Sequence, residues 1–429
     1  MSGGAAGAGA APGRGVSFFR SRWVERPEHV TELAPSALPR GFRAAGVAAG
    51  LKRTGLDLGV LVSDEAATAS AARFTTNARV GAPVIVSRAA ALERLRAVVA
   101  NSGGSNTGDG ERGIETAAAM QAHAAELLGV EPAQVGVAST GVIGRELPRS
   151  AVLAGIEAAC ASLGEQAAGL SEAILTTDNA PKRACLEVEL PSGAVRIAAQ
   201  AKGAAMISPR FATMLCFVQT DAALAADTLD LLTGVCVKRS FDRISVDGQL
   251  STSDTVFALA GGRSGVEVRP ETDDELRFGE ALDALLRQLA LEILADGEGS
   301  ARVGRVIVRG HSESVEPVAR AVADSPLVKT ALHGGDPNFG RILQAAGAAF
   351  AACAAGEPFF VDLELQGHQV VSAGEAIELD EAELGELEAA VLEDEVELVL
   401  ALPGEGGEAE VFFSDLSEAY VSFNSRYTT

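Results

Sequence analysis

The order of apolar and polar positions along the chain predicts strands and helices that alternate. Short apolar runs bounded by turn residues are typical of strands, and they occur at 58–62, 83–86, 95–100, 135–138, 305–308 and 420–424. Apolar residues at helical spacing predict helices at 113–128, 151–163, 222–232 and 315–323, and along the stripe from Leu282 to Ile293. Residues 66–73 are predicted to form a short helical or turn segment.

Two pairs of strands are predicted to form hairpins. Residues 184–190 and 194–200 flank a Pro-Ser-Gly turn, and residues 395–402 and 409–413 flank a Gly-rich turn. Because strands, hairpins and helices alternate loosely, we expect an α/β fold of helices layered on largely antiparallel or mixed sheets. The sequence alone does not give the strand order.

The stretch 198–221 carries the most distinctive candidate chemistry. After Lys202 and a Ser-Pro break, Ala212 and Thr213 precede the apolar run 214–218. A threonine hydroxyl is a weak nucleophile unless a base lies within reach, and the residue's own α-amine can be that base. Cleavage between Ala212 and Thr213 would create this amine and expose the nucleophile together. Without further context, a threonine before an apolar run is more often an ordinary strand residue.

Four other residues are candidates for an acyl-transfer site. Thr140 and Gly141 follow a short strand and could offer a hydroxyl and a backbone N–H to an oxyanion, although an ordinary turn is the simpler interpretation. Lys202 could bind a substrate carboxylate. Glu298, in a Gly-rich turn after the long helix, could bind a cationic group. An exposed side chain is the alternative for both charged residues.

Composition and charge exclude several classes of function. Asp and Glu number 58 against 35 Lys and Arg, so a net charge of −23 argues against nucleic acid and anionic membranes as partners. The five cysteines lack CxxC spacing and the five histidines lack HExxH, so we expect no disulfide and no metal. No apolar run reaches the ~18 residues of a membrane span. We read no signal peptide, expect a cytoplasmic protein, and expect residues 1–38 to be a flexible tail.

Longer motifs carry a family resemblance. The stretch KGAAMISPRFATML resembles the pattern KGxGMIxPxxATML of the ornithine acetyltransferase family, and STGVIG, TTDNAPK, DGEG, SPLVKTALHGGDPNFGRI and YVSFNSRYTT extend the resemblance from about Gly41 to Thr429. The resemblance implies a layered α/β sandwich of the self-processing N-terminal-nucleophile type. It also implies cleavage between Ala212 and Thr213 into an α chain, 39–212 after the tail, and a β chain, 213–429.

The resemblance further implies a ping-pong reaction of arginine biosynthesis. Thr213 would carry acetyl from N2-acetyl-L-ornithine to L-glutamate, with Thr140 and Gly141 as the oxyanion hole. The implied substrate-binding residues are Thr177 (or its neighbour Thr176), Lys202, Thr213, Glu298, Asn424 and Thr429. Two α and two β chains would assemble, and no cofactor is expected. Some family members also use acetyl-CoA as a co-substrate, which these residues do not settle.

Departures from the family pattern and three alternatives remain open. Ala205 replaces a usual glycine, Phe339 replaces a usual tryptophan, and the loop at 105–107 differs, which puts the acceptor preference in doubt. The chain could be an N-terminal-nucleophile hydrolase, in which water takes the acyl group. It could also be an uncut paralogue that only binds amino acids, or a transferase with a different acceptor.

Overall fold

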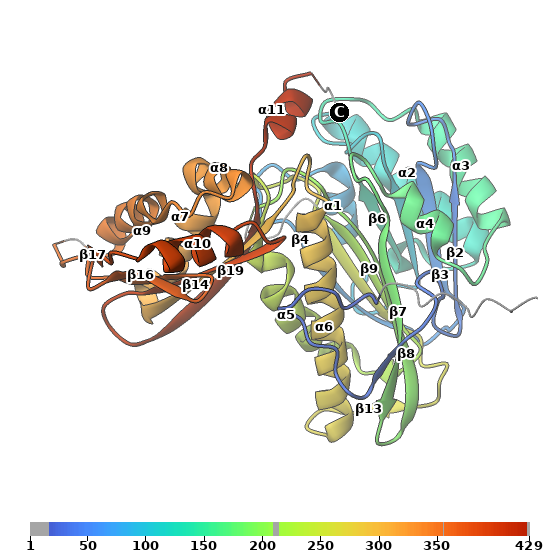
Figure 1. Cartoon of the computed structure of the whole chain (residues 1–429). Helices are drawn as coiled ribbons and strands as arrows, with labels where there is room; N and C mark the ends of the chain where they lie inside the picture. Colours follow the sequence, from blue (N-terminus) through green and yellow to red (C-terminus); the bar gives the residue numbers. More distant parts are fainter. Residues whose placement is uncertain (1–16, 209–213, 355, 427–429) are drawn as a thin grey trace, which may run out of the picture.

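A six-stranded mixed sheet forms the centre of the fold (Figure 1). The structure is a computed structural model and describes residues 17–208, 214–354 and 356–426. The strand order is β1 (Val30–Glu32), β7 (Lys182–Leu190), β8 (Gly193–Lys202), β9 (Leu215–Thr220), β12 (Thr255–Ala260) and β4 (Ala69–Phe74). Strand β9 is antiparallel to β8 and parallel to β12, so the chain that follows residue 213 enters the middle of this sheet.

A second sheet packs against the first. It has the order β2 (Phe42–Val47), β3 (Leu58–Ser63), β5 (Ala97–Asn101) and β6 (Val135–Ser139). Leu215 and Phe217 of β9 face the core between the two sheets, whereas Cys216 and Val218 face the opposite core. Because both faces of β9 are buried, its first four residues, 215–218, form a continuous apolar run rather than an alternating one.

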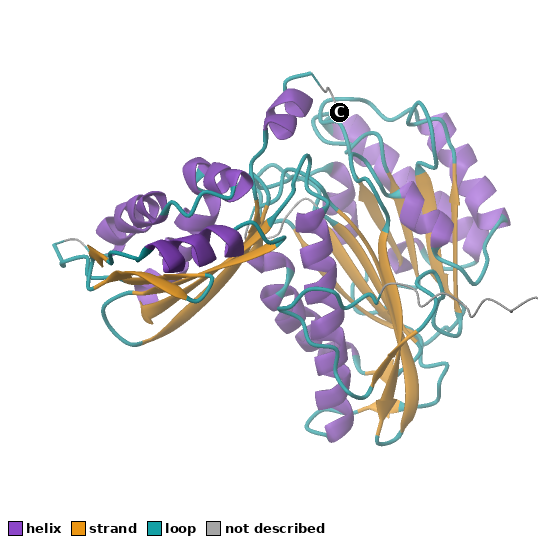
Figure 2. Cartoon of the chain, in the orientation of Figure 1, coloured by secondary structure: helices purple, strands orange, loops and turns teal. Residues whose placement is uncertain are grey.

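Helices cover the outer face of each sheet, so the layers follow the order helix, sheet, sheet, helix (Figure 2). Helices α2 (Glu111–Leu128) and α3 (Arg149–Ala161) cover the four-stranded sheet, and α5 (Ala226–Arg239) and α6 (Asp273–Ala295) cover the six-stranded sheet. Shorter elements connect the layers: α1 (Ala82–Arg88), α4 (Ala168–Ala173), β10 (Ala223–Leu224), β13 (Glu267–Val268), and the 3-10 turns Pro132–Gln134 and Phe241–Arg243. The expected layered α/β architecture with mixed sheets is confirmed.

The C-terminal part forms a separate core beside these layers, at the left of Figure 1. Its sheet has the order β11 (Ile244–Ser245), β19 (Gly406–Ser414), β14 (Val303–His311), β18 (Glu395–Ala401), β15 (Asp362–Leu365), β16 (His368–Ser372) and β17 (Glu375–Ala376). The helices of this part are α7 (Ser312–Asp324), α8 (Pro326–Gly334), α9 (Phe339–Cys353) and α10 (Glu381–Ala390). Helix α11 (Glu418–Asn424) follows and projects back toward the main body (Figure 1).

Three predictions of element type are wrong. The apolar run 83–86 lies in helix α1, where Pro83 occupies the first turn, a position that proline favours. Residues 66–73 were predicted as helix or turn, but Ala69–Phe74 forms β4 and pairs with β12 along its full length. The segment 420–424 is helical, because Ser417 caps α11 by accepting a hydrogen bond from Tyr420 N.

Three further expectations differ in detail. Strands β18 and β19 do not form the predicted hairpin, because β14 lies between them, parallel to β18 and antiparallel to β19. The helix expected at 222–232 is Ala226–Arg239. Residues 17–38, expected as part of a flexible tail, instead pack on the body: β1 pairs with β7, and Val24 and Val30 are buried. Residues 1–16 lie outside the described residues.

Candidate active site

The Thr140–Gly141 turn at the end of β6 is fixed by the last residue of β5 and the loop that follows it. Thr140 N donates to Asn101 O at 3.0 Å, and Ser139 Oγ donates to Asn101 Oδ1 at 2.6 Å. Gly141 has a φ of +121°, and a β-carbon there would lie 2.7 Å from the carbonyl carbon of Gly103. Only glycine fits this conformation and this contact. The turn therefore holds the Thr140 hydroxyl and the Gly141 backbone in one arrangement.

Lys202 reaches the same turn from the end of β8. Its Nζ lies 2.8 Å from Thr176 Oγ1 and 3.4 Å from Thr140 Oγ1. The lysine is only 2% exposed, and burial lowers its pKa, an effect that Asp178 partly opposes. The structure thus brings together two of the predicted site residues and one of the two alternative threonines. Thr176 makes the contact to Lys202, while Thr177 is half-buried beside it.

A charged network next to Lys202 escaped the sequence-based interpretation. The fully buried Asp178 carboxylate accepts from Lys182 Nζ and Gly203 N, each at 2.7 Å, and Lys182 Nζ also contacts Asp296 Oδ2 at 2.5 Å. Burial opposes the ionisation of Asp178, but Lys202 and Lys182 hold its pKa below the usual range. Both Asp178 and Lys182 lie within the TTDNAPK motif, which was the available signal.

Glu298 and Asn424 form a second pair of predicted residues. Asn424 Nδ2 donates to Glu298 Oε2 at 2.7 Å, and Glu298 N donates to Ala204 O at 3.0 Å. Ala204 follows Lys202 by two residues, so Glu298 is tied to the Lys202 segment. Tyr420, on the same helix as Asn424, donates its hydroxyl to Asp247 Oδ2 at 3.1 Å. The two clusters of predicted residues, one cationic and one anionic, therefore belong to one region.

Met214 and Leu215, at the start of β9, contact residues of both neighbouring strands. Leu215 of β9 pairs with Lys202 on one neighbouring strand and with Thr255 on the other. Met214 N donates to Asp254 Oδ1 at 3.1 Å, and burial raises the pKa of Asp254 well above its usual range. The predicted residues Ala212, Thr213 and Thr429 lie outside the described residues.

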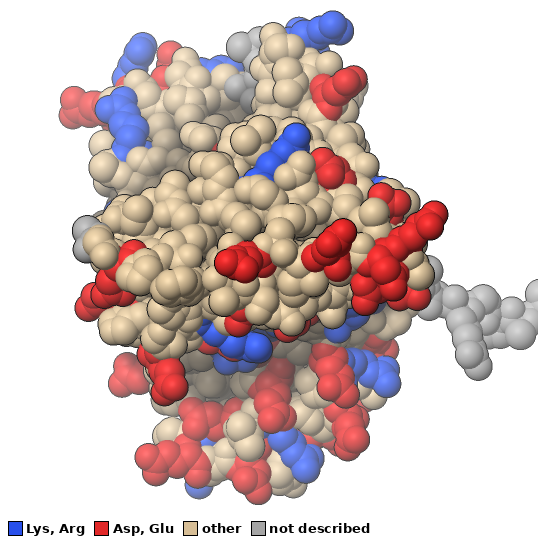
Figure 3. Space-filling view, turned by 60° about the vertical axis from the view of Figure 1, so that its left-hand side comes forward, with Lys and Arg blue, Asp and Glu red and all other residues tan. Residues whose placement is uncertain are grey.

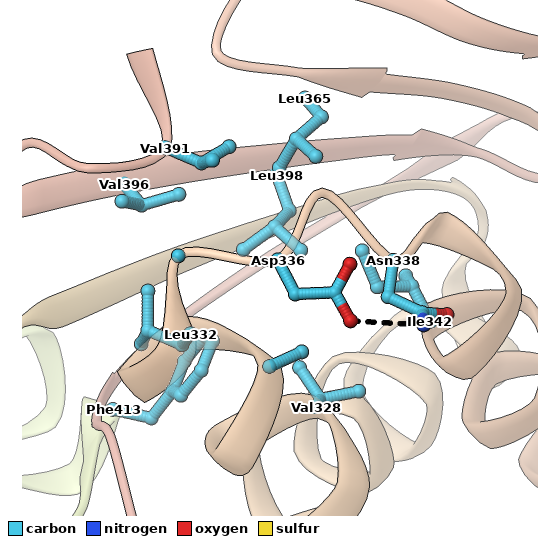
Figure 4. Close-up of a pocket in the computed structure, with 12 residues that line it drawn as sticks. Val328, Leu332, Asp336, Asn338, Ile342, Leu365, Val391, Val396, Leu398 and Phe413 are labelled. Atoms are coloured by element: carbon cyan, nitrogen blue, oxygen red, sulfur yellow. Dashed lines mark hydrogen bonds between the residues drawn. The ribbon is translucent and has the colours of Figure 1, made fainter. Parts of the chain in front are cut away.

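The apolar cavity of the C-terminal part is unrelated to this cluster. It measures about 30 Å³ and lies between α8 and the sheet, with Asp336 and Asn338 as its polar rim (Figure 4). Hydrocarbon side chains such as Leu332, Leu398 and Phe413 make up most of its wall (Figure 4). A space of this size holds about one water molecule, so we interpret it as a packing defect.

The described residues contain no group of three or more His, Cys, Asp or Glu side chains that could hold a metal ion. Across the same ranges, no helix is long and apolar enough to cross a membrane. Figure 3 shows Asp and Glu side chains interspersed with Lys and Arg over the face that it draws, in keeping with the acidic composition.

The model of the ArgJ family matches residues 43–429, nearly the whole chain. The chain belongs to the ArgJ family. The arginine biosynthesis bifunctional protein ArgJ of Rhodopirellula baltica is 42% identical over 417 residues, which cover 93% of this chain and all of the relative. The protein of the same name from Symbiobacterium thermophilum is 42% identical over 399 residues, covering 91% and 98%. The family resemblance seen in the sequence is thereby confirmed. The family to which the chain belongs is one of arginine biosynthesis proteins.

Two solved structures are also similar to this ArgJ-family chain. A crystal structure of arginine biosynthesis bifunctional protein ArgJ from Bacillus halodurans is 33% identical, covers 43% of this chain and 97% of its own, and has a TM-score of 0.37. The ornithine acetyltransferase of Mycobacterium tuberculosis, solved with ornithine, is 32% identical, with coverages of 43% and 99% and a TM-score of 0.39.

Proposed function

We propose that this chain is an acetyltransferase of arginine biosynthesis that moves acetyl from N2-acetyl-L-ornithine to L-glutamate. One observation carries the proposal: in an ArgJ-family chain, Lys202 contacts Thr140 and Thr176. Lys202 lies at the end of β8 and pairs with Leu215, the first residue of β9. The family match and the names of the relatives, which are bifunctional proteins of arginine biosynthesis, support the pathway.

The nucleophile in this proposal is Thr213, freed by self-cleavage after Ala212. In the cleavage step, Thr213 Oγ attacks the Ala212 carbonyl carbon, the C–N bond breaks, and water hydrolyses the resulting ester. The new α-amine then acts as the base. It takes the Thr213 hydroxyl proton as Oγ attacks the acetyl carbonyl, and it returns a proton to the ornithine amine as that C–N bond breaks.

The described residues supply the surroundings for this step. Thr140 Oγ and the Gly141 N–H stabilise the oxyanion, each such donor contributing on the order of 3 kcal/mol. Lys202 binds the carboxylate of the amino-acid substrate, and Glu298 with Asn424 binds its cationic end. The amine of glutamate then attacks acetyl-Thr213, giving N-acetylglutamate and restoring the free hydroxyl. Acetyl moves between two amines of similar basicity, so the exchange requires no ATP.

The proposal has three further parts. Thr177 and Thr429 complete the substrate site, and acetyl-CoA serves as a second acetyl donor, which the word bifunctional in the relatives' names supports. The two fragments assemble as two α and two β chains in the cytoplasm. Release of free CoA from acetyl-CoA and glutamate tests the second donor, and light scattering of the purified protein tests the assembly.

The central test is a coupled activity and cleavage assay. Purified protein is incubated with acetylornithine and glutamate, and ornithine is measured. We expect ornithine from the wild type and from Lys238→Met, which alters an exposed lysine on α5, but little from Lys202→Met. No ornithine from folded, cleaved protein would refute the proposal, and acetate released without glutamate would favour a hydrolase instead.

A denaturing gel tests the processing step separately. We expect fragments of residues 1–212 and 213–429 from the wild type, and an uncut chain from Thr213→Ala. Amino-terminal sequencing of the second fragment should begin at Thr213. A wild-type chain that stays intact would remove the proposed base and nucleophile and would favour an amino-acid-binding paralogue.

A further inference from the structure

The Asp178 carboxylate joins two segments of the candidate site, the loop 176–178 and the end of β8. Its Oδ2 accepts from Thr176 N at 3.1 Å and lies 3.9 Å from Lys202 Nζ, while its Oδ1 accepts from Gly203 N at 2.7 Å. The Asp178 side chain has no solvent exposure. One carboxylate therefore fixes the backbone beside Thr176, the backbone after Lys202 and the position of the Lys202 ammonium.

Lys182 compensates the charge of Asp178 and extends the network. Its Nζ donates to Asp178 Oδ1 at 2.7 Å and to Asp296 Oδ2 at 2.5 Å, and Asp296 also accepts from Asn179 N at 3.0 Å. Asp296 caps the end of α6 and lies two residues before Glu298. The network thus links the Lys202 cluster to the turn that carries Glu298.

Apart from Asp178, the immediate surroundings of Lys202 offer little that stabilises its protonated form. It is 2% exposed, and the neighbours that its Nζ contacts directly, Thr140 and Thr176, are uncharged. Burial without a counter-charge favours the neutral amine. As an ammonium, Lys202 donates to Thr140 Oγ1 and occupies a lone pair, which leaves the Thr140 hydroxyl proton free to bind an oxyanion.

We propose that Asp178 is a positioning residue of the acyl-transfer site: its carboxylate holds the Lys202 side chain against Thr140 and Thr176 and is the nearest opposite charge to the Lys202 amine. The catalytic meaning of this role rests on the proposed function, but the effect on Lys202 does not. Asp178 acts through Lys202 and contacts no group to which we assign a bond-making or bond-breaking step.

Several charged groups surround Lys202, and they shift the pKa of its side chain in opposite directions. Asp178, Asp254 and Glu298 favour its protonated form, whereas burial and the nearby cation Lys182 oppose it. Lys52, whose Nζ donates to Leu175 O at 2.9 Å, is a second cation that interacts with Lys202. Removing the Asp178 charge should therefore lower the protonation midpoint of Lys202, and removing the Lys182 charge should raise it.

Lysine NMR measures this midpoint directly, because the chain has only five lysines: Lys52, Lys182, Lys202, Lys238 and Lys329. Full-length protein is labelled at lysine Cε and Nζ, the Lys202 signal is assigned with Lys202→Arg, and its shift is followed against pH. We expect Asp178→Asn to lower the Lys202 midpoint by about one pH unit or more. Exposed Lys238 serves as the internal reference.

Two variants keep the test decisive. Lys182→Met should raise the Lys202 midpoint, so it tests the same network in the opposite direction if Asp178→Asn does not fold. Asp230→Asn, which removes an exposed partner of Arg73, should leave the midpoint unchanged. An unchanged Lys202 midpoint in folded Asp178→Asn, or in Lys182→Met when the first variant is unfolded, would overturn the proposal.

The kinetic consequence separates this role from a purely structural one. In Asp178→Asn, the alkaline limb of kcat for acetyl transfer should move to lower pH together with the Lys202 midpoint. A variant that only loses folded protein would show lower activity at every pH with the limb in place, and that result would count against the proposal. If the wild type transfers no acetyl group, the proposed function fails, while the NMR midpoints still decide the role of Asp178.

Discussion

Replacing Gly141 by alanine tests whether the turn after β6 is held by backbone packing. The wild-type backbone at Gly141 has a φ of +121°, and an added β-carbon would lie 2.7 Å from both Gly103 C and Gly104 N. Gly144, three residues later, supplies a matched control. It also has a positive φ, +79°, but a β-carbon there would meet nothing within 4 Å.

The structure gives different magnitudes for the two substitutions. Both variants place alanine in a left-handed backbone region, which costs about 1–2 kcal/mol. Gly141→Ala must also separate two backbone segments from 2.7 Å to an ordinary contact near 3.4 Å, and overpacking of this kind adds about 1–3 kcal/mol. A site tolerates only about 0.5 Å of misplacement, so loss of the Gly141 oxyanion contact should reduce kcat by about 10²-fold or more.

Thermal unfolding and acetyl transfer measure these two effects. Stability is compared in the uncut Thr213→Ala background, so that both variants unfold as one chain, and kcat is measured in the cleavable protein. We expect Gly141→Ala to have the lower unfolding midpoint and to lose activity, while Gly144→Ala loses only stability. Equal midpoints for the two variants, together with normal turnover by Gly141→Ala, would refute the packing argument.

Three other predictions concern different parts of the chain. Asn424→Ala removes the 2.7 Å hydrogen bond to Glu298. It should raise KM for acetylornithine by about 10-fold, since a hydrogen bond to a charged group contributes about 1.5 kcal/mol or more; steady-state kinetics with an unchanged KM would contradict this. Leu398→Ala enlarges the cavity of the C-terminal part and should cost about 2–5 kcal/mol in urea unfolding, against little for the control Leu392→Ala, which is 55% exposed. Burial lowers the pKa of Lys329 to about 8 from a usual 10.5, so between these pH values the unfolded chain binds more protons than the folded one, and the free energy of unfolding should rise with pH by up to ~3 kcal/mol. Urea unfolding of Lys329→Met over this pH range should lack the rise, and the same slope as in the wild type would show that Lys329 does not cause it.

The sequence predicts correctly the elements that are long enough for the spacing of their apolar residues to indicate their type. Helix α2 shows one apolar face and ends at Gly129, which has the expected left-handed conformation, φ +67°. The runs at 83–86 and 420–424 are short, and a short apolar run does not distinguish a strand from one or two turns of helix. In both cases the signal lies at or just before the start of the run: Pro83 occupies the first turn of α1, and Ser417 is the N-cap of α11.

Pairing between distant strands was not predictable from these patterns. Residues 395–401 and 406–414 are neighbours in sequence and both form strands, yet β14, about 90 residues earlier in the chain, lies between them. The β14–β18 pairing is parallel, and a parallel pair is never joined by a tight turn, so no local turn signal marks it. Because no local pattern indicates the strand that lies between β18 and β19, the Gly-rich connection at 403–407 is typical of a hairpin turn when only the sequence is considered.

The candidate site shows the same division between local and long-range information. The family motifs predict Thr140, Lys202, Glu298 and Asn424 as site residues, carried over position by position, and these roles stay predictions. Asp178 lies in the TTDNAPK motif, but its proposed role depends on burial with Lys182 and on contact with the end of β8. Neither condition can be read from residue spacing alone.

The scarcity of lysine in the sequence is a signal for buried amine positions that the sequence analysis does not use. Only five of the 35 basic residues are lysines, and three of them, Lys182, Lys202 and Lys329, are 2–3% exposed. Arginine supplies the surface ion pairs, such as those of Arg43, Arg239 and Arg309. The ammonium group is compact and its pKa shifts readily on burial, whereas arginine stays charged and needs a planar set of acceptors. At these three buried positions, lysine supplies a compact amine where a planar guanidinium would not fit, and Lys202→Arg should not preserve the contacts to Thr140 and Thr176.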